Sequence, residues 1–188
     1  MSGAILLLIF IVLVIAVILL LISNYNSFIK LRNIVKDSWS QILVQLKRRH
    51  DLIPNLMETV KGYVKHERET LENVIKARNY AMNAGSVADK AKAESLLTEA
   101  MNRLAVVVEN YPELKANENF LALHEELTST ENKISFARQN YNDQVMVFNV
   151  KVQSFPSNIV ASMFNFKEES FFNIEVPAEK EVPKVSFS

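Results

Sequence analysis

The chain has 188 residues, and its 21 basic and 21 acidic residues give a formal net charge of zero. It contains no cysteine, which excludes disulfides, thiol catalysis and cysteine-based metal sites. A neutral chain produces no overall field that attracts nucleic acid, and its scarcity of glycine and proline favours long helices over a strand-rich fold.

The first segment, residues 4–22, reads "AILLLIFIVLVIAVILLLI" and is apolar without interruption. As a helix it is about 28 Å long, close to the hydrocarbon thickness of a bilayer. It is too long for the apolar core of a signal peptide, and no small-x-small cleavage site follows it. A domain of this size has too few residues to bury such a helix on all sides. The sequence therefore predicts a single-pass anchor in the cell membrane.

Three basic residues follow the anchor closely, namely Lys30, Arg32 and Lys36, and none precedes it. The positive-inside rule then predicts an external N-terminus and a cytoplasmic remainder of the chain. A helical rise places the three bases about 12 to 21 Å beyond the span, within reach of anionic headgroups. They are the candidate lipid-headgroup bases.

Apolar residues recur at helical spacing from Phe28 to Leu46, so we expect the anchor to continue into a longer helix. Pro54 disfavours helix at Ile53 and is tolerated in a first turn, so we expect a corner within "KRRHDLIPNL", where Asp51 is able to cap the next helix. The second helix then runs from about Pro54 to Asn83.

Two further helices are expected after this one. Ser86 caps a third helix over about 87–110, and a fourth runs over 117–155 and ends at Pro156. Ser157 caps a short helix, "NIVASMF", which stops near Asn165, a residue that tolerates left-handed geometry. The tail "EVPAEKEVPKVSFS" lacks helical periodicity and is expected to be extended.

Short loops between long amphipathic helices predict antiparallel neighbours. The fold class is therefore all-α: a transmembrane helix that continues into an antiparallel up-down bundle. The expected segments are an anchor over 4–22, a helical bundle over 23–172 and an extended or disordered tail over 173–188.

The fourth helix, about 58 Å long, exceeds the roughly 39 Å between the anchor and Arg49, so we expect it to overshoot, bend or end beside the bilayer. An aromatic segment follows it. Two interpretations stay open: a hydrophobic lid on the base of the bundle, or an interfacial segment that touches lipid headgroups or another protomer. The candidate interfacial aromatics are Phe155, Phe164, Phe166, Phe171 and Phe172.

The bases of the expected corner lie about 39 Å from the bilayer, beyond the reach of lipid. Up-down topology brings them opposite a stretch with six glutamates between Glu109 and Glu131. Two interpretations stay open: a charge match within the chain, or a partner or neighbouring subunit that satisfies the same charges. The candidate charged interaction surface consists of Lys47, Arg48, Arg49, Glu113, Glu118 and Glu125.

No catalytic constellation is visible. His50, His66 and His124 fall on different elements, and the sequence lacks H-E-x-x-H, E-x-x-H, a phosphate loop and G-x-S-x-G. Each histidine is best interpreted as a surface residue, and Arg78 and Arg138 as residues that fix the register of the bundle. We predict no enzymatic activity, no catalytic or metal site and no cofactor.

Several long blocks resemble the LemA family of bacterial membrane proteins. They include "YNSFIKLRNIVKDSWSQILVQLKRRHDLIPNLMETVKGYVKHERETLENVIKAR", "YPELKANENFLALHEELTSTENKISFARQNYNDQVMVFN", "SFPSNIVASMF" and "PKVSF". Departures occur at Asn165 and Ser170, where the family more often has glycine and proline. The resemblance implies an N-terminal anchor, an antiparallel helical domain, no accepted enzymatic activity and a link to bacterial membrane organisation.

The leading hypothesis is a membrane-held helical-bundle scaffold that self-associates, motivated by the long fourth helix, the aromatic segment and the valine-containing tail. The alternative is a monomeric adaptor or sensor that presents its distal charged end to a soluble partner. The expected partners are membrane lipid, further copies of the chain and an unidentified protein, with no nucleic acid.

Overall fold

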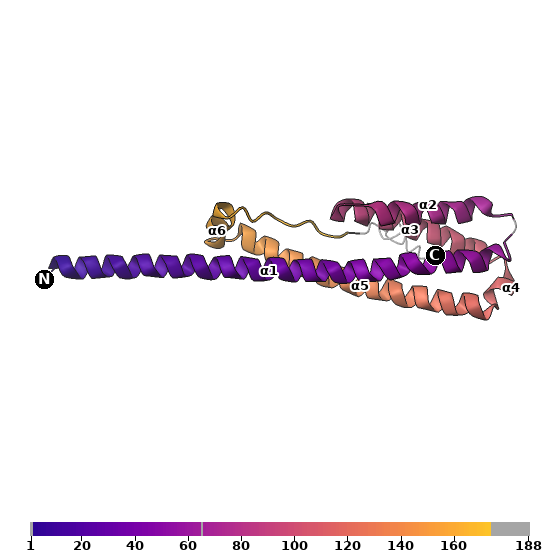
Figure 1. Cartoon of the computed structure of the whole chain (residues 1–188), viewed down its shortest axis with the longest axis horizontal. Helices are drawn as coiled ribbons and strands as arrows, with labels where there is room; N and C mark the ends of the chain where they lie inside the picture. The colour runs from indigo at the N-terminus through magenta and orange to yellow at the C-terminus, as the bar shows by residue number, and fades with distance from the viewer. Residues whose placement is uncertain (1, 65, 174–188) are drawn as a thin grey trace, which may run out of the picture. The chain divides into compact units, whose positions relative to one another are not determined.

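The computed structural model describes residues 2–64 and 66–173, and these form helices and connections without any strand (Figure 1). This confirms the all-α fold class. The helices in chain order are α1 (Ser2–Lys61), α2 (Arg68–Asn83), α3 (Val87–Val108), α4 (Pro112–Lys115), α5 (Glu118–Gln153) and α6 (Ser157–Met163).

The described residues form two compact units, and α1 and α5 contribute to both. The first unit contains residues 2–40 and 140–169, and the second contains 41–139 and 170–173. The division into anchor, bundle and tail remains a prediction, and the tail lies outside the described residues beyond Asn173.

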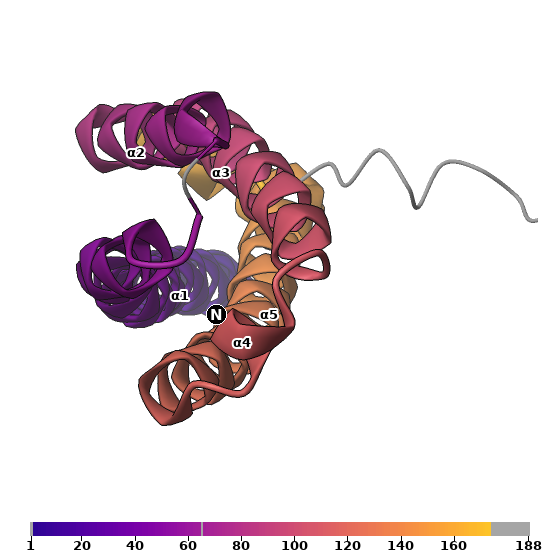
Figure 2. The same cartoon turned by 90° about the vertical axis from the view of Figure 1, so that its right-hand side faces the viewer.

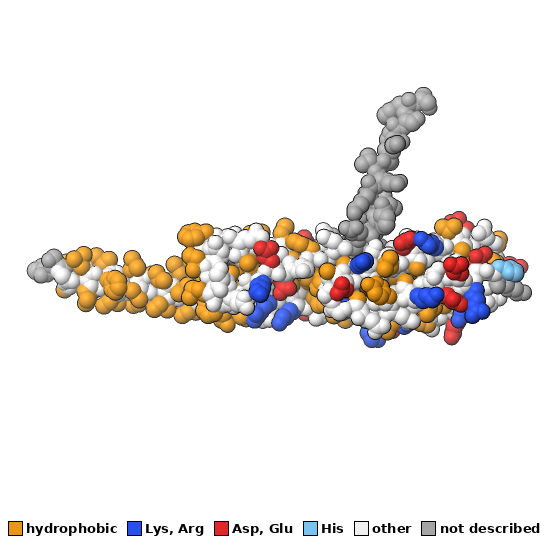
Figure 3. Space-filling view, turned by 90° about the horizontal axis from the view of Figure 1, so that it is seen from above, with side chains coloured by type: hydrophobic (Ala, Val, Ile, Leu, Met, Phe, Trp, Pro, Cys, Tyr) orange, Lys and Arg blue, Asp and Glu red, His pale blue; other side chains and the backbone are white. Residues whose placement is uncertain are grey.

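The N-terminal part of α1 fits a membrane anchor. Side chains 5–20 are all exposed, and this is the only helix among the described residues that is long and apolar enough to cross a membrane. Figure 3 shows hydrophobic side chains along this segment and charged ones only further along the chain.

The first unit contains an aromatic cluster made of Tyr25, Phe28, Phe148, Phe164 and Phe166. Phe28, Phe148 and Phe166 are buried, and Tyr25 and Phe164 form its exposed edge. Phe28 stacks on Phe166 with ring centroids 4.7 Å apart and meets the edge of Phe148 at 6.1 Å. In the same unit α1 and α5 run antiparallel, since Asn140 Nδ2 donates to Ser38 Oγ and Lys151 Nζ to Ser27 Oγ.

The expected corner at Pro54 is wrong, because α1 runs through this proline to Lys61. Proline lacks the N–H that would bond the carbonyl four residues back, which belongs to His50. That carbonyl instead accepts a hydrogen bond of 2.6 Å from Arg78 Nε of α2. The actual corner is the Gly62–Glu67 connection, and Asp51 lies inside α1 rather than at a helix start.

The continuous α1 also removes the predicted length mismatch. Beyond the anchor, α1 includes residues 23–61, a length similar to the 36 residues of α5. The overlong fourth helix therefore no longer argues for self-association.

In the second unit α2 packs against α3, and α4 lies between the end of α3 and the start of α5 (Figure 2). Ser86 caps α3 as predicted, because its Oγ accepts from Asp89 N at 3.0 Å. Asn117 prepares the start of α5: its Oδ1 accepts from Phe120 N and its Nδ2 donates to Tyr63 Oη, both at 3.0 Å.

Ser157 does not cap α6 as expected, whereas the expected end of the helix near Asn165 is confirmed. Ser157 Oγ points back to the carbonyls of Lys151 and Ser154, at 2.7 and 2.9 Å, and so satisfies the end of α5. Asn165 adopts a left-handed φ of 56°, and Phe166 N bonds Ala161 O at 2.9 Å. This is a Schellman ending, with asparagine at the position that usually carries glycine.

Candidate functional site

A buried ionic cluster lies in the second unit, where α1 meets α3 and α5. It consists of Arg49, His50, Glu94, Thr98 and Glu131. His50 Nε2 and Glu94 Oε1 are 2.8 Å apart, and Arg49 Nη2 donates to Thr98 Oγ1 at 2.9 Å. Arg49 Nη1 lies 3.2 Å from Glu131 Oε2 and 3.7 Å from Glu94 Oε2.

The burial of these charges determines what the cluster does. Glu94 is 0% exposed and Arg49 only 4%. Removing two charges from water costs several kcal/mol per ion unless they pair, so each must remain opposite its partner. The paired charges of the cluster therefore join α1 to α3 and α5.

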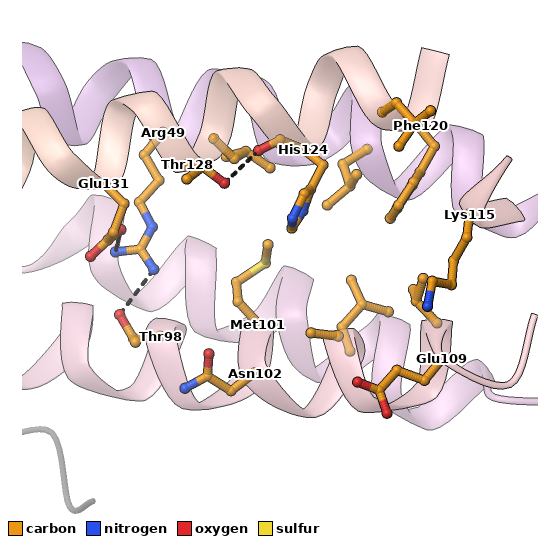
Figure 4. Close-up of a pocket in the computed structure, with 16 residues that line it drawn as sticks. Arg49, Thr98, Met101, Asn102, Glu109, Lys115, Phe120, His124, Thr128 and Glu131 are labelled. Carbon is orange, nitrogen blue, oxygen red and sulfur yellow. Dashed lines mark hydrogen bonds and ion pairs between the residues drawn. The ribbon is translucent and has the colours of Figure 1, made fainter. Parts of the chain in front are cut away.

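A cavity of about 480 Å³ lies next to this cluster, between α3 and α5 (Figure 4). Its walls are mainly apolar, and Met101 and His124 point into it from opposite sides. The volume falls within the range of small-molecule pockets. Two carboxylates, Glu109 and Glu131, line opposite ends of the cavity.

Two of the ionisable groups around the cavity have partners: Glu131 is paired with Arg49, and the ring of His124 stacks on Phe120 with centroids 5.9 Å apart. Residues 2–64 and 66–173 contain no group of three acidic or histidine side chains arranged to hold a metal ion.

The predicted charged interaction surface is divided by the fold. Lys47 pairs with Asp51 at 2.7 Å within α1, and this contact holds the pKa of the Asp51 carboxyl below its usual value. Arg48 pairs with Glu126 on α5. Arg49 is buried and so belongs to no surface, which corrects the prediction. Glu113, Glu118 and Glu125 are exposed on the second unit.

The predicted intramolecular charge match therefore exists, through Glu126 and Glu131 of the acidic stretch and not through the three glutamates named for the surface. Glu126 and Glu131 supply the partners on α5, and Glu94 on α3 was missed. A signal for Glu94 was present: it lies three residues from both Ala91 and Leu97, inside the apolar stripe of α3. His50 gives the same signal between Leu46 and Ile53, and its burial corrects the surface interpretation. His66 and His124 are exposed.

The candidate lipid bases also differ from one another. Lys30 and Lys36 are exposed, whereas Arg32 is partly buried. The Arg32 guanidinium lies 5.3 Å from the centroid of the Phe166 ring, a cation–π contact. Arg32 thus helps to hold the aromatic cluster, and contact of the three bases with lipid remains a prediction.

The five candidate aromatics separate into two groups. Phe166 and Phe172 are buried, so they form part of the core and their interfacial role is wrong. Phe155, Phe164 and Phe171 are exposed, and Phe155 is 80% exposed. Burial of Phe166 and Phe172 agrees with the lid interpretation, and contact of the exposed residues with lipid or another protomer remains a prediction.

These features define a class: a membrane-associated, all-α protein whose buried polar groups organise helices. The chain belongs to the LemA family, whose sequence profile matches residues 38–187. It is 26% identical to Protein LemA of Metamycoplasma hominis over 161 residues, which cover 85% of this chain and 71% of the relative. It is also 24% identical to Magnetosome protein MamQ 2 of Paramagnetospirillum magneticum and 22% identical to Magnetosome protein MamQ of Magnetospirillum gryphiswaldense, each over 84% of this chain and 67% of the relative.

Proposed function

We propose that this protein is a membrane-anchored helical scaffold that self-associates through the outer face of α5 and has no enzymatic activity. The observation that carries the proposal is an uncovered groove on one face of that helix. Leu121 and Phe136 are at its two ends, and Phe136 is 73% exposed. Glu125 and Lys133 lie between them, with Thr128, Ser129 and Asn132 near the centre.

This face is complementary to itself. If two α5 helices pair antiparallel about Ser129, a two-fold axis brings Glu125 of one copy opposite Lys133 of the other. The same axis brings Leu121 to within one residue of the position opposite Phe136. Two-fold interfaces require this self-complementarity, because each contact occurs twice. The small polar residues at the centre allow close approach of the two helices.

A charge swap tests this arrangement. Glu125→Lys and Lys133→Glu each place like charges opposite one another, so either variant should lower the particle mass of the full-length protein in mild detergent. The double variant restores the opposite charges and should restore the mass. Phe136→Ser should also weaken association, whereas Leu96→Ser, at an exposed leucine of α3, is the matched control.

Two results would contradict the proposal. One is a monomeric mass for the unchanged protein. The other is a double charge swap that associates no better than the single variants, because the pairing about Ser129 would then be wrong.

The cavity beside the ionic cluster favours a second candidate, a monomeric membrane-tethered adaptor or sensor. In this case the cavity and the neighbouring charged groups of the second unit receive a soluble partner. For this candidate the charges of Lys47 and Arg48 are reversed (Lys47→Glu and Arg48→Glu). Arg49 is left unchanged, because reversal of its buried charge would disrupt the fold. A monomeric mass unaffected by Glu125→Lys favours the adaptor over the scaffold.

The proposed location is the cell membrane, with the N-terminus outside and the helical units in the cytoplasm. The bases that follow the anchor support this orientation. Membership of the LemA family and the likeness to relatives named as magnetosome proteins favour a role in membrane organisation. A cysteine introduced at Met82, in an otherwise cysteine-free chain, should react with an impermeant reagent only after the cells are opened.

A further inference from the structure

The surface around α6 is apolar on its outer side as well as on its packed side. Ser157, Val160 and Ala161 are buried. Ile159 and Met163, four residues apart, share the opposite face and are exposed. Phe155 and Phe164, which flank α6, are exposed too. Together Phe155, Ile159, Met163 and Phe164 form what we call the α6 surface.

The position of this surface along the anchor follows from ring contacts within the first unit. The ring of Phe164 lies 4.7 Å from that of Tyr25. Tyr25 follows Ile22, the last residue of the apolar span, by three residues, which corresponds to about 4.5 Å of helical rise. The carboxyl end of α6 therefore lies close to the level where the apolar span of α1 ends.

Several contacts hold α6 at this level. Phe166, directly after the left-handed Asn165, is wedged between Phe28 and the Arg32 guanidinium. At the other side of α6, Ser157 bonds the last carbonyls of α5, and Lys151 of that turn bonds Ser27 on α1 at 2.5 Å. These contacts prevent the α6 surface from turning away from the end of the span.

We propose that the α6 surface is a second membrane contact, in which Phe155, Ile159, Met163 and Phe164 enter the interfacial zone of the bilayer that holds the anchor. Interfacial helices place their apolar face roughly 5 to 10 Å into the boundary between headgroups and acyl chains. The exposed Lys30 and Lys167 of the same unit favour anionic headgroups. The contact fixes the tilt of α1 relative to the membrane, because the chain then meets lipid at two places.

This inference rests on the anchor and is independent of self-association through α5. It can be tested in the full-length protein reconstituted into vesicles of zwitterionic and anionic phospholipid. The cysteine-free sequence allows one fluorescent label at Met163→Cys. Met82→Cys, at an exposed methionine of α2, is the matched control. The emission of the label is quenched in two ways: by a quencher attached to lipid near the headgroup, or by a quencher dissolved in water.

We expect the lipid-borne quencher to reduce emission several-fold more at position 163 than at position 82, and the aqueous quencher to do the reverse. Equal quenching at the two positions would overturn the proposal. A second result would also overturn it: position 163 is protected from both quenchers, and this protection disappears when the protein is diluted in lipid. In that case a second copy of the chain would cover the α6 surface.

Discussion

The interiors of the two units differ in charge. In the first, ring contacts of the aromatic cluster hold α1, α5 and the segment after α6 together. The second also has an apolar core, but it buries Arg49, His50 and Glu94 as well, and their paired charges join α1 to α3 and to the exposed Glu131 of α5. Both units lie on the same two long helices, so the difference arises from the residues that each stretch of helix supplies.

The comparison teaches how each region responds to change. Apolar packing depends mainly on volume, so similar rings replace one another at small cost. A buried ion pair depends on each partner, and the loss of one leaves the other charge without compensation. Both units should therefore be sensitive to the size of buried side chains, and the second also to the loss of a charge.

The largest effect is expected for Phe28→Ala, which removes a fully buried ring that contacts Phe148 and Phe166. The free energy of unfolding should fall by about 4 kcal/mol, from lost burial plus the cavity that remains. Denaturant unfolding of the full-length protein in detergent, followed by circular dichroism, measures it. Phe28→Leu should cost much less, and an equal loss would show that the ring contacts, and not volume, control the unit.

The second-largest effect is expected for Glu94→Gln, which should lower the free energy of unfolding by about 3 kcal/mol. The substitution preserves volume but removes the carboxylate that faces Arg49 and His50. The same unfolding measurement applies. Glu99→Gln is the control on α3, since Glu99 is exposed and pairs only with Arg103 four residues on. If the two variants lost equal stability, the ionic cluster would not have the role inferred from its burial.

Arg78→Met should cost about 2 kcal/mol, because it removes a charged donor from the His50 carbonyl that Pro54 leaves unpaired. Pro54→Ala supplies an N–H for that carbonyl, so the effect of Arg78→Met should be smaller in the Pro54→Ala background. A double-mutant cycle measures this coupling. Additive effects would show that the Arg78 contact does not compensate for the proline.

The smallest effect concerns the exposed pair of Lys47 and Asp51. The hydrogen bond from Lys47 lowers the pKa of Asp51, so its contribution is present at neutral pH. A depressed carboxyl pKa makes that contribution disappear as pH falls below the ordinary value of about 4 and through the folded pKa. Lys47→Met should return the Asp51 pKa towards its usual value in an NMR titration, with little change in stability. If the pKa of Asp51 did not change, the hydrogen bond from Lys47 would not be the cause of its low value.

Much of the architecture was predictable from local patterns. The apolar run of residues 4–22, the Ser86 cap and the left-handed Asn165 were predicted correctly in kind, because each depends on nearby residues alone. The charge match between Arg48 and the acidic stretch also followed from topology, with Glu126 as the partner and not its neighbour Glu125. Adjacent residues of a helix point about 100° apart, so the topology predicted the pairing but not which of the two glutamates makes it.

The remaining features depended on distant residues. Pro54 disfavours helix locally, and only the arrival of Arg78 on α2 satisfies the carbonyl that it leaves open. Glu94 and His50 resemble isolated polar positions until α1 and α3 pack together and each becomes the other's partner. Local propensities, set by the order of amino acids, determined that the chain is helical and that its first helix begins with a run apolar enough for a membrane anchor. Tertiary packing decided where the first helix ends and which charges are buried, because the free energy of a buried polar group depends on partners that the neighbouring sequence does not contain.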